Sequence, residues 1–386
     1  MYSSFYTSVS GMNAFSQQLS VISDNIANTN TTGYKSGNTS FAEILNASVM
    51  SNSSMGIGNG VLVQKIAEDW TQGAVASTGN SNDFAITGAG LFVVSDADGL
   101  VSYTRDGQFF YNADGILVTA TGRAVQGYPI DADGNVSNAF GNITFTDATL
   151  PATAPSTFST SINLNSGTEI GGAFSTTINV YDSLGNAVPL TLNFTKTAAN
   201  SWSWTSAIPA TFGSTASSGT MTFNADGSLT AGTNPAVDLT LTNGATAAQS
   251  ITWGIYNTSG TTNGTMTQYA GSSAITNASQ NGASSGQIES IYTDNYGVMT
   301  ASYSNGVTRP VYQLALATFN NYNGLNKAGN NLYLASAESG LPIYGVAGSG
   351  QFGVLLSGNL ETANVDMATE MADMLIAQRA YESCAR

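Results

Sequence analysis

The chain has 386 residues, of which 42% are hydrophobic and only 9% are charged, and its formal net charge is −15. This length allows two or three domains, each with a core of its own. Nine Lys and Arg, no His and one Cys exclude the basic patch that nucleic acid or an anionic membrane surface requires, as well as His-dependent catalysis, Cys-cluster metal sites and an intrachain disulfide.

No motif in the chain marks a chemical site. The eight Glu and sixteen Asp make chance pairs of carboxylates, but no local pattern identifies a glycosidase pair. We therefore predict that the chain is not an enzyme and that it has no catalytic, cofactor-binding or metal-ligating residues. It contains no run of 18 apolar residues, so we expect no membrane insertion. No basic residue precedes Lys35, so we expect no cleaved signal peptide.

The first 35 residues begin with the pattern of an amphipathic helix. Apolar residues recur every three or four positions, and they are Phe5, Val9, Met12, Phe15, Leu19, Ile22 and Ile26. Polar residues occupy the opposite face. Gly33 follows a stretch rich in Thr and Asn, and it indicates the end of the helical segment.

The middle of the chain is predicted to be rich in β-strands. Short runs of β-branched and aromatic residues alternate with turn signals. These signals are Asn59-Gly60, Asp98-Gly99, Asp114-Gly115, Asp133-Gly134, Asp226-Gly227, Asn243-Gly244 and Asn305-Gly306. The last of them predicts a hairpin from Val298 to Tyr303 and from Val307 to Phe319.

Three features of the middle region each allow two interpretations. Tetrads of the form [Asp/Asn]-Ala-Asp-Gly could bind calcium, but the two tested fail the EF-hand spacing, so we favour hairpin turns. Trp202 and Trp204 lie on one face of a predicted strand, where they either pack in a core, which we favour, or stack on sugars. Gly88-Ala89-Gly90 lacks the third glycine of a dinucleotide fingerprint, so we expect a kink between two strands. The tetrads begin at Asp96, Asn112, Asp131 and Asn224.

The C-terminal segment is predicted to be a second amphipathic helix. Asp366 is a plausible N-cap, and Glu370 lies in the first turn. The apolar stripe consists of Met367, Met371, Met374, Leu375 and Tyr381. No turn signal precedes Arg386, so we expect the natural helix to continue beyond it.

The two terminal stripes either face the core of their own chain or pair with each other and with neighbouring subunits. Their position at the ends of the chain favours the second interpretation, because free termini fray unless they are docked. Isolated helices are marginal in water, so we expect both helices to need a partner surface.

The predicted fold class is mainly β with α-helical termini. We expect a terminal helical domain (1–35 and 360–386) whose helices pair like a coiled coil, and a connecting segment (36–72). A discontinuous β domain (73–149 and 286–359) then carries an inserted β domain (150–285). The boundaries are placed at small, polar stretches near 150–157, which contains Pro151 and Pro155, and near 276–286.

Both ends carry residues that resemble the signatures of the flagellar rod and hook axial protein family. The N-terminal signature comprises Ser10-Gly11-Met12-Asn13-Ala14, Asp24-Asn25-Ile26-Ala27-Asn28 and Thr31-Thr32-Gly33-Tyr34-Lys35. The C-terminal one comprises Asn364-Val365-Asp366 and Gln378-Arg379-Ala380-Tyr381. Residues 83–94 are similar to the first β segment of the same family. The similarity covers roughly residues 1–145 and 287–386, and the insert carries no motif that we can assign.

The resemblance implies a structural subunit of the bacterial flagellar hook. Such subunits self-assemble into a flexible helical tube, the universal joint that transmits torque from rod to filament. The rod, the hook cap, the hook–filament junction proteins and the type III export apparatus are the implied partners, and the implied location is extracellular. The large insert favours the hook, but the rod-like residues 3–11 leave the distal rod as an alternative. A secreted glycan-binding or adhesive β protein is the alternative from another class, supported by the Trp pair.

Overall fold

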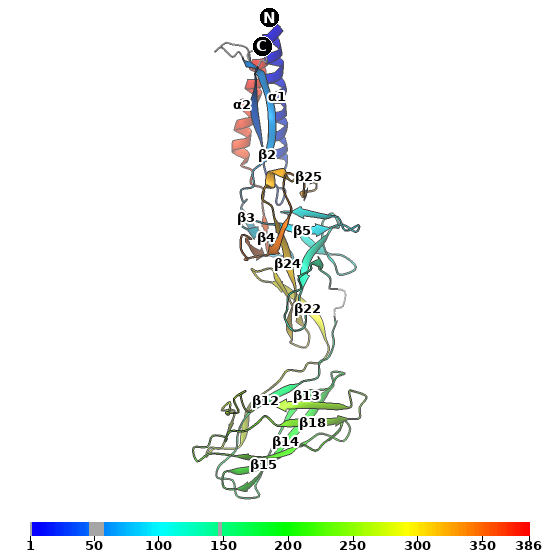
Figure 1. The fold of residues 1–386 in the computed structure, drawn as a ribbon, viewed down its shortest axis with the longest axis vertical. Coiled ribbons are helices and arrows are strands. Elements are labelled where there is room, and N and C mark those ends of the chain that lie inside the picture. The colour runs from blue at the N-terminus through cyan, green and yellow to red at the C-terminus, as the bar shows by residue number, and fades with distance from the viewer. Residues whose placement is uncertain (1, 46–57, 146–148) are drawn as a thin grey trace. The chain divides into compact units, whose positions relative to one another are not determined.

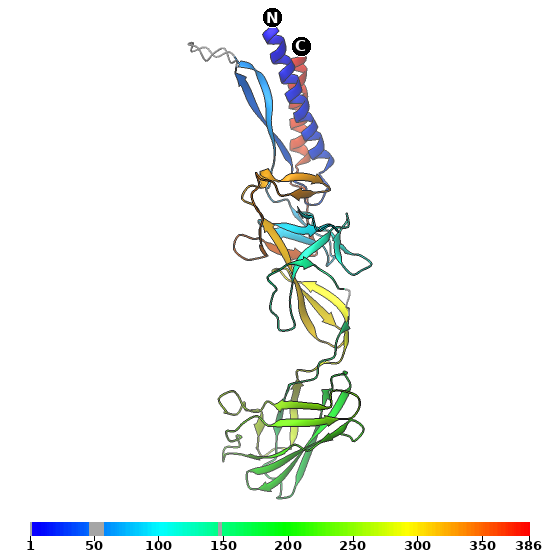
Figure 2. The same ribbon diagram turned by 45° about the vertical axis from the view of Figure 1, so that its right-hand side comes forward.

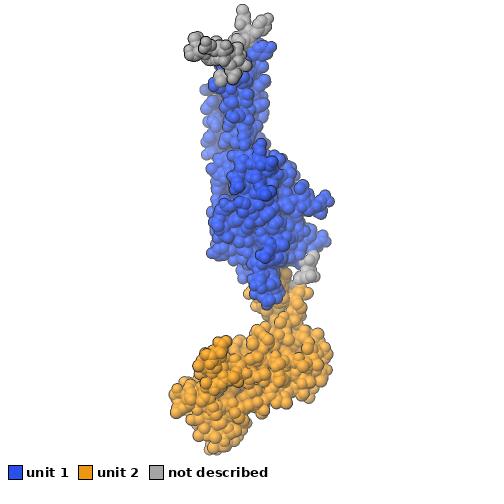
Figure 3. Space-filling view, viewed as in Figure 1, with its two compact units in different colours: residues 1–146, 290–301, 309–386 blue, residues 147–289, 302–308 orange. Residues whose placement is uncertain are grey.

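The computed structural model describes residues 2–45, 58–145 and 149–386. The chain divides into two compact units, coloured separately in Figure 3. Unit 1 contains residues 1–146, 290–301 and 309–386, and unit 2 contains residues 147–289 and 302–308. The architecture is mainly β with one helix near each terminus (Figure 1), so the predicted fold class is confirmed.

The two helices of unit 1 pack side by side and run antiparallel (Figures 1 and 2). They are α1 (Tyr2–Ala27) and α2 (Met367–Ala385). Gly11, near the start of α1, lies against Cys384 at the end of α2. Asn25, near the end of α1, donates a hydrogen bond to Glu370 in the first turn of α2.

A β hairpin packs along α1, and the sequence did not predict it. Its strands are β1 (Gly37–Leu45) and β2 (Gly58–Glu68), which pair antiparallel. The Phe15 and Phe41 rings lie 5.8 Å apart. Residues 36–72 therefore do more than connect two domains. The prediction of a turn at Asn59-Gly60 is wrong, because both residues lie within β2, where Gly60 (φ 107°) lets the strand approach Ser10 of α1.

The β body of unit 1 is a sheet whose strand order includes β23-β24-β9-β5-β6-β26-β25. Successive side chains on a strand point to opposite faces of the sheet, so one strand can contribute to an apolar cluster on each face. On β5, Leu91 and Val93 enter one apolar cluster while Phe92 and Val94 enter another. Two short ladders, β28-β4 and β29-β3, connect this body to the segment that leads into α2.

The bounds of these strands are β3 (Val75–Ser77), β4 (Phe84–Thr87), β5 (Leu91–Ser95), β6 (Val101–Thr104), β7 (Phe109–Tyr111), β8 (Leu117–Thr119), β9 (Ala124–Pro129), β10 (Gly141–Asn142), β22 (Gly286–Thr293), β23 (Val298–Tyr303), β24 (Thr308–Thr318), β25 (Asn326–Gly329), β26 (Leu332–Leu334), β27 (Ile343–Val346), β28 (Val354–Ser357) and β29 (Asn359–Glu361).

The Asx-Gly tetrads form turns, as predicted. The side chain of Asp96 accepts hydrogen bonds from the backbone N–H groups of Asp98 and Leu100, and Gly99 has a φ of 83°. The same pattern recurs at Asn112 and Asp131. The predicted hairpin is also confirmed, because Asn305-Gly306 joins β23 to β24.

Unit 2 contains two sheets that share one apolar core. One has the order β16-β18-β19-β12-β20, with β21 also paired to β12, and the other has the order β13-β14-β15-β17. Trp202 and Trp204 lie in this core together with Trp253, and the Trp204 and Trp253 rings are 5.3 Å apart. The favoured core interpretation of the Trp pair is therefore confirmed, and these rings are not available to stack on sugars.

The bounds of these strands are β11 (Thr149–Leu150), β12 (Thr157–Asn163), β13 (Ala173–Tyr181), β14 (Ala187–Ala198), β15 (Ser201–Ala207), β16 (Gly213–Thr215), β17 (Ser218–Thr222), β18 (Ala236–Leu241), β19 (Ala248–Trp253), β20 (Met266–Thr267) and β21 (Ala274–Gln280).

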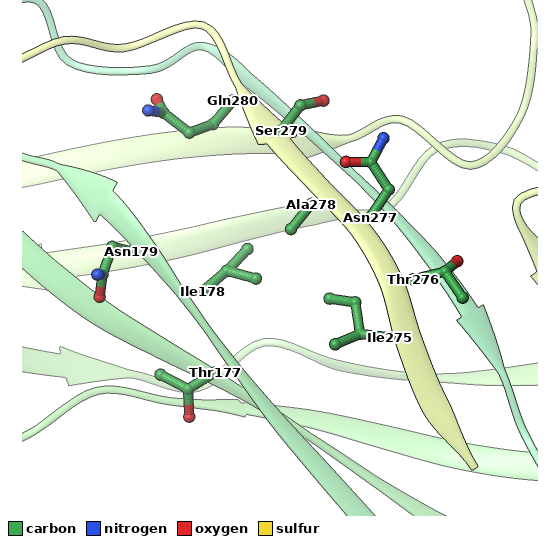
Figure 4. Close-up of a pocket in the computed structure, with 9 residues that line it drawn as sticks. All are labelled: Thr177, Ile178, Asn179, Ile275, Thr276, Asn277, Ala278, Ser279 and Gln280. Atoms are coloured by element: carbon green, nitrogen blue, oxygen red, sulfur yellow. The ribbon is translucent and has the colours of Figure 1, made fainter. Parts of the chain in front are cut away.

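A groove of about 580 Å³ opens between the edge strands β13 and β21 (Figure 4). Neither strand carries a charged residue. The stretch near 276–286, where the sequence analysis places a domain boundary, begins within strand β21, because residues up to Gln280 pair with β12. Asn277 and Ser279, which contributed to the placement of the boundary, are exposed on this edge strand, where polar residues are tolerated.

Replacing Trp253 with Ala should destabilise unit 2 by about 3–5 kcal/mol, because the indole is fully buried and leaves a cavity. Urea unfolding followed by the fluorescence of Trp202 and Trp204 measures the change. Thr240→Ala, on the exposed face of β18, is the control, and it should change the free energy of unfolding by less than about 0.5 kcal/mol. Equal effects of the two variants would contradict the assignment of Trp253 to the core.

Candidate assembly site

A buried carboxylate holds two cations at the junction between the helices and the β body. Glu361 Oε1 accepts from Lys35 Nζ at 2.7 Å, and Glu361 Oε2 accepts from Arg105 Nε at 2.5 Å. The three side chains are only 1%, 2% and 6% exposed, respectively. We call Glu361, Lys35 and Arg105 the anchor triad. It joins the segment after α1, the end of β6 and the end of β29.

The backbone around the kink at Gly88-Ala89-Gly90 accepts the remaining hydrogen bonds of the Arg105 guanidinium. Its guanidinium donates to the carbonyl groups of Ile86, Gly88 and Gly90. Gly88 (φ 113°) and Gly90 (φ 135°) adopt conformations that favour glycine, so the chain can turn its carbonyls toward one cation. The predicted kink between two strands is confirmed at this place.

The charges of the triad control the ionisation of Glu361. Burial alone would raise the pKa of this carboxyl group, but Arg105 and the hydrogen bond from Lys35 outweigh burial and hold the pKa below its ordinary value. The carboxylate therefore stays charged at neutral pH. An unpaired charge at this depth would be costly, so the triad stabilises unit 1 only while all three members are present.

The residues of the N-terminal signature wrap around the triad. Gly33 (φ 66°) donates its N–H to the Glu361 carbonyl oxygen at 2.8 Å. A Cβ at this position would lie 2.6 Å from the Arg105 backbone. Thr32 donates to Asp106 at 2.8 Å, and the Tyr34 hydroxyl donates to Asp24 at 3.1 Å. Thr31 donates to the Asn28 side chain, while Ala27 is the exposed last residue of α1.

Asn25 connects α1 to both neighbouring elements. Its Oδ1 accepts from the N–H of Gly37 at 2.8 Å, and its Nδ2 donates to the Gly37 carbonyl at 2.9 Å and to Glu370 at 3.0 Å. One buried amide thus joins α1, the start of β1 and the first turn of α2. Asn25 belongs to the N-terminal signature, but our sequence analysis predicted no contact for its side chain. A polar residue on the inward side of an apolar stripe was the signal that could have identified it.

The C-terminal signature fixes the start of α2. Asn364 Oδ1 accepts from the N–H of Ser36 at 2.8 Å, and its Nδ2 donates to the Asp69 carbonyl at 2.8 Å. Asp366 is the N-cap, as predicted, and it accepts from the N–H groups of Ala368 and Thr369. Val365 is half-buried, whereas Gln378 and Arg379 are exposed.

The predicted apolar stripes are only partly covered within unit 1. On α1, Ile22 is buried and Phe5 is 68% exposed. The half-buried members are Val9, Met12, Phe15, Leu19 and Ile26. On α2, Met374 is half-buried and the exposed members are Met367, Met371, Leu375 and Tyr381. The chain therefore leaves much of both stripes uncovered.

The helices contact each other through small residues that the apolar pattern did not identify. Gly11, Ala14 and Ala377 are buried on the contact face. A Cβ at Gly11 would lie 3.0 Å from Cys384 Sγ, so glycine permits the close approach. The periodicity of large apolar residues did not identify this contact, because the closest approach of the two helices is made by small side chains.

Four family models match parts of the chain. They are the flagella basal body rod protein (residues 5–35), the flagellar hook protein FlgE/F/G D1 domain (85–168), the flagellar basal body protein FlaE D2 domain (146–283) and the flagellar basal body rod FlgEFG protein C-terminal region (356–386). The chain is 36% identical to the flagellar hook protein FlgE of Salmonella typhimurium, over 99% of this chain and 96% of that one. The chain belongs to the flagellar hook protein family.

Other relatives agree with this family. The flagellar hook protein FlgE of Rhizobium meliloti is 36% identical, over 99% of this chain and 94% of that one. The crystal structure of the Helicobacter pylori flagellar hook protein FlgE2 has a similar fold, with a TM-score of 0.58 at 16% identity. The match covers 74% of this chain and 100% of that one. Within the described residues, no helix is both long and apolar enough to cross a membrane.

Residues of the anchor triad lie in three of the four matched regions. Lys35 ends the rod-protein match, Arg105 lies in the D1 match and Glu361 lies in the C-terminal match. Our sequence analysis identified Lys35 but missed Arg105 and Glu361. A motif lysine in a chain with so few charges suggests a buried counterion, but the sequence does not indicate which of eight Glu supplies it.

Replacing Glu361 with Gln should lower the free energy of unfolding of unit 1 by about 3–5 kcal/mol at pH 7, because two buried cations lose their counterion. The pKa of Glu361 is lower in the folded chain than its ordinary value of 4.5. Its contribution is therefore complete above pH 4.5 and is lost as the pH falls through the folded pKa. The difference between wild type and the variant should shrink in that acidic range.

Chemical unfolding followed by helix circular dichroism, repeated between pH 3 and pH 7, measures both effects. Arg123→Gln is the matched control, because it removes the cation of a partly exposed ion pair. Arg123 Nη1 lies 3.6 Å from Asp96 Oδ2, and the two side chains are 23% and 29% exposed. The substitution should cost no more than about 1 kcal/mol. A difference in the free energy of unfolding between wild type and Glu361→Gln that does not change with pH would rule out a charge effect at this site.

Proposed function

We propose that this chain is a structural subunit of the bacterial flagellar hook and that it self-assembles into a flexible helical tube. One observation carries the proposal. The α1–α2 pair is fastened to the β body by a buried ionic junction, yet it leaves large apolar side chains exposed. Phe5, Leu375 and Ile376 are 68%, 57% and 65% exposed. Large apolar side chains left exposed on an ordered helix pair support a subunit contact there.

The junction suits a subunit that transmits torque. Force applied to the helices passes to the β body through the anchor triad, whose side chains are buried and hydrogen-bonded, while Asn25 holds α1 to α2 and to the start of β1. Polar groups buried in this way hold one geometry, since displacing them leaves charges unpaired. The helices and the β body of unit 1 should therefore move as one piece.

We attribute the flexibility of the tube to contacts between the β domains of neighbouring subunits. The chain is only 9% charged, and the edge strands β13 and β21 of unit 2 carry only uncharged residues. Ser, Thr and Asn can exchange hydrogen bonds with one another and with bridging water at small cost. Neighbouring subunits could then shift relative to one another without breaking fixed ion pairs.

The family supports the hook over the distal rod. The hook protein relatives match along nearly the whole chain, including the region that matches the D2 domain. The proposed role is structural and not catalytic. The proposed partners are other copies of the chain, the rod, the hook cap, the hook–filament junction proteins and the type III export apparatus. The proposed location is the extracellular hook. The sugar-binding alternative loses its main support with the burial of the Trp pair.

Replacing Leu375 with Asp should abolish tube formation at protein concentrations at which wild type assembles. Leu375 is exposed, so the charge should leave the fold of the single chain within about 0.5 kcal/mol of wild type. In the assembled tube, an unpaired carboxylate would have to be buried. Electron microscopy of the concentrated protein is the measurement, and curved tubes are expected for wild type.

Leu375→Met, which keeps an apolar side chain of similar volume, should assemble like wild type. Straight, rigid wild-type tubes would instead favour the distal rod. Tubes formed equally well by Leu375→Asp would exclude this face of α2 from the subunit contact.

A further inference from the structure

A groove with an acidic rim runs beside α1 in unit 1. Its volume is about 530 Å³, and it lies between α1, β2 and the start of β25. We call it the α1 groove, and its principal lining residues are Val21, Asp24, Tyr34, Ile66, Glu68 and Lys327. The apolar members offer room for aliphatic side chains, and Ile66 is 51% exposed although it is large and apolar.

The charge of the α1 groove is not balanced within the chain. Glu68 is paired with Lys327 at 2.5 Å. Asp24 accepts hydrogen bonds only from neutral groups, the Tyr34 hydroxyl at 3.1 Å and the Asn28 amide at 3.0 Å, in the described part of the chain. Lys327 also lies close enough to interact electrostatically with Asp24, so one cation faces two carboxylates and the groove keeps a net negative charge that can attract a cation from outside.

Few Lys and Arg side chains of this chain are available to pair with the groove carboxylate of a second copy. Of nine Lys and Arg, Lys35, Arg105, Arg123 and Lys327 are paired with carboxylates, and Lys196 donates to two carbonyl groups. Among the described residues, no ion pair is formed by Lys65, Arg309, Arg379 or Arg386.

Arg379 is distinguished from the other three by its place in an apolar row. Met367, Met371, Leu375 and Arg379 follow one another at intervals of four residues along α2, so they lie on adjoining turns of one side of the helix. All four are exposed. We call this row the α2 stripe. It combines aliphatic side chains with one guanidinium, and the α1 groove combines an apolar lining with one unbalanced carboxylate.

We propose that the α2 stripe of one subunit docks into the α1 groove of a second copy of the chain, with Arg379 against Asp24. This inference rests on the proposed function, and it names the surfaces that the subunits use. The two surfaces are different patches of unit 1, so the contact is heterologous. A heterologous contact that does not close into a ring generates an open helical filament, which is the geometry that a tube requires.

Exchanging the two charges tests the pairing directly. R379E and D24R should each raise the critical concentration for tube formation by about tenfold or more, as expected when one partner of a desolvated ion pair is reversed. The double variant D24R/R379E should return it to within about threefold of wild type. Pelleting of tubes over a dilution series measures the critical concentration. K65E, which alters net charge as much as R379E, is the control and should stay within about threefold of wild type.

A second double-mutant cycle uses smaller changes, in case D24R disturbs the fold around position 24. D24N keeps an acceptor for the Tyr34 hydroxyl, and R379Q removes the charge of its partner. If the residues pair, D24N/R379Q should lose no more assembly than the worse single variant. Wild-type tubes together with additive losses and no rescue in D24R/R379E would overturn this contact and leave the proposed function standing. Failure of the wild type to assemble under all conditions would overturn both.

Discussion

The arrangement of unit 1 depends on one buried carboxylate shared by two cations. Glu361 lies on the segment that leads into α2, Lys35 follows α1 and Arg105 belongs to the β body. Each is too costly to bury alone, so they constrain three distant parts of the chain to one geometry. Gly33, Asn364 and the kink at Gly88-Ala89-Gly90 supply the close backbone approach and the remaining hydrogen bonds.

This constraint separates two tasks that the same helices perform. One face of the α1–α2 pair is closed by Gly11, Ala14 and Ala377, where small side chains permit close contact. The large apolar residues, such as Leu375, remain exposed for another surface. The junction thus orients the helices by polar contacts, and it leaves the apolar residues available for assembly. In a chain with nine basic residues, few ion pairs remain for contacts between subunits.

Much of this fold was predictable from local patterns. The helices follow a period of three to four, and the hairpin at Asn305-Gly306 and the Asx-Gly turns follow from backbone chemistry at short range. The Trp pair was predicted to lie in a core because two alternate residues share one face. In each case, the interaction that decides the structure lies within a few residues along the chain.

The features that the sequence did not predict depend on long-range contacts. Glu361 is 326 residues from Lys35 and 256 from Arg105, so no local spacing relates them. The hairpin of β1 and β2 was missed because its faces are mostly half-exposed and its Asn59-Gly60 pair resembles a turn. The contact face of α2 was missed because small residues carry no apolar signal. The partners in the assembled tube stay a prediction, because they lie outside one chain.

Hydrogen exchange of the full-length chain, compared between wild type and Glu361→Gln, tests most directly whether the anchor triad holds the helices to the β body. The account predicts that α1 and α2 lose protection together in the variant, while the strands of unit 2 keep theirs, because local opening follows the loss of a shared contact. Unchanged protection of α1 in the variant would contradict it, and the triad would then be an isolated feature of the β body.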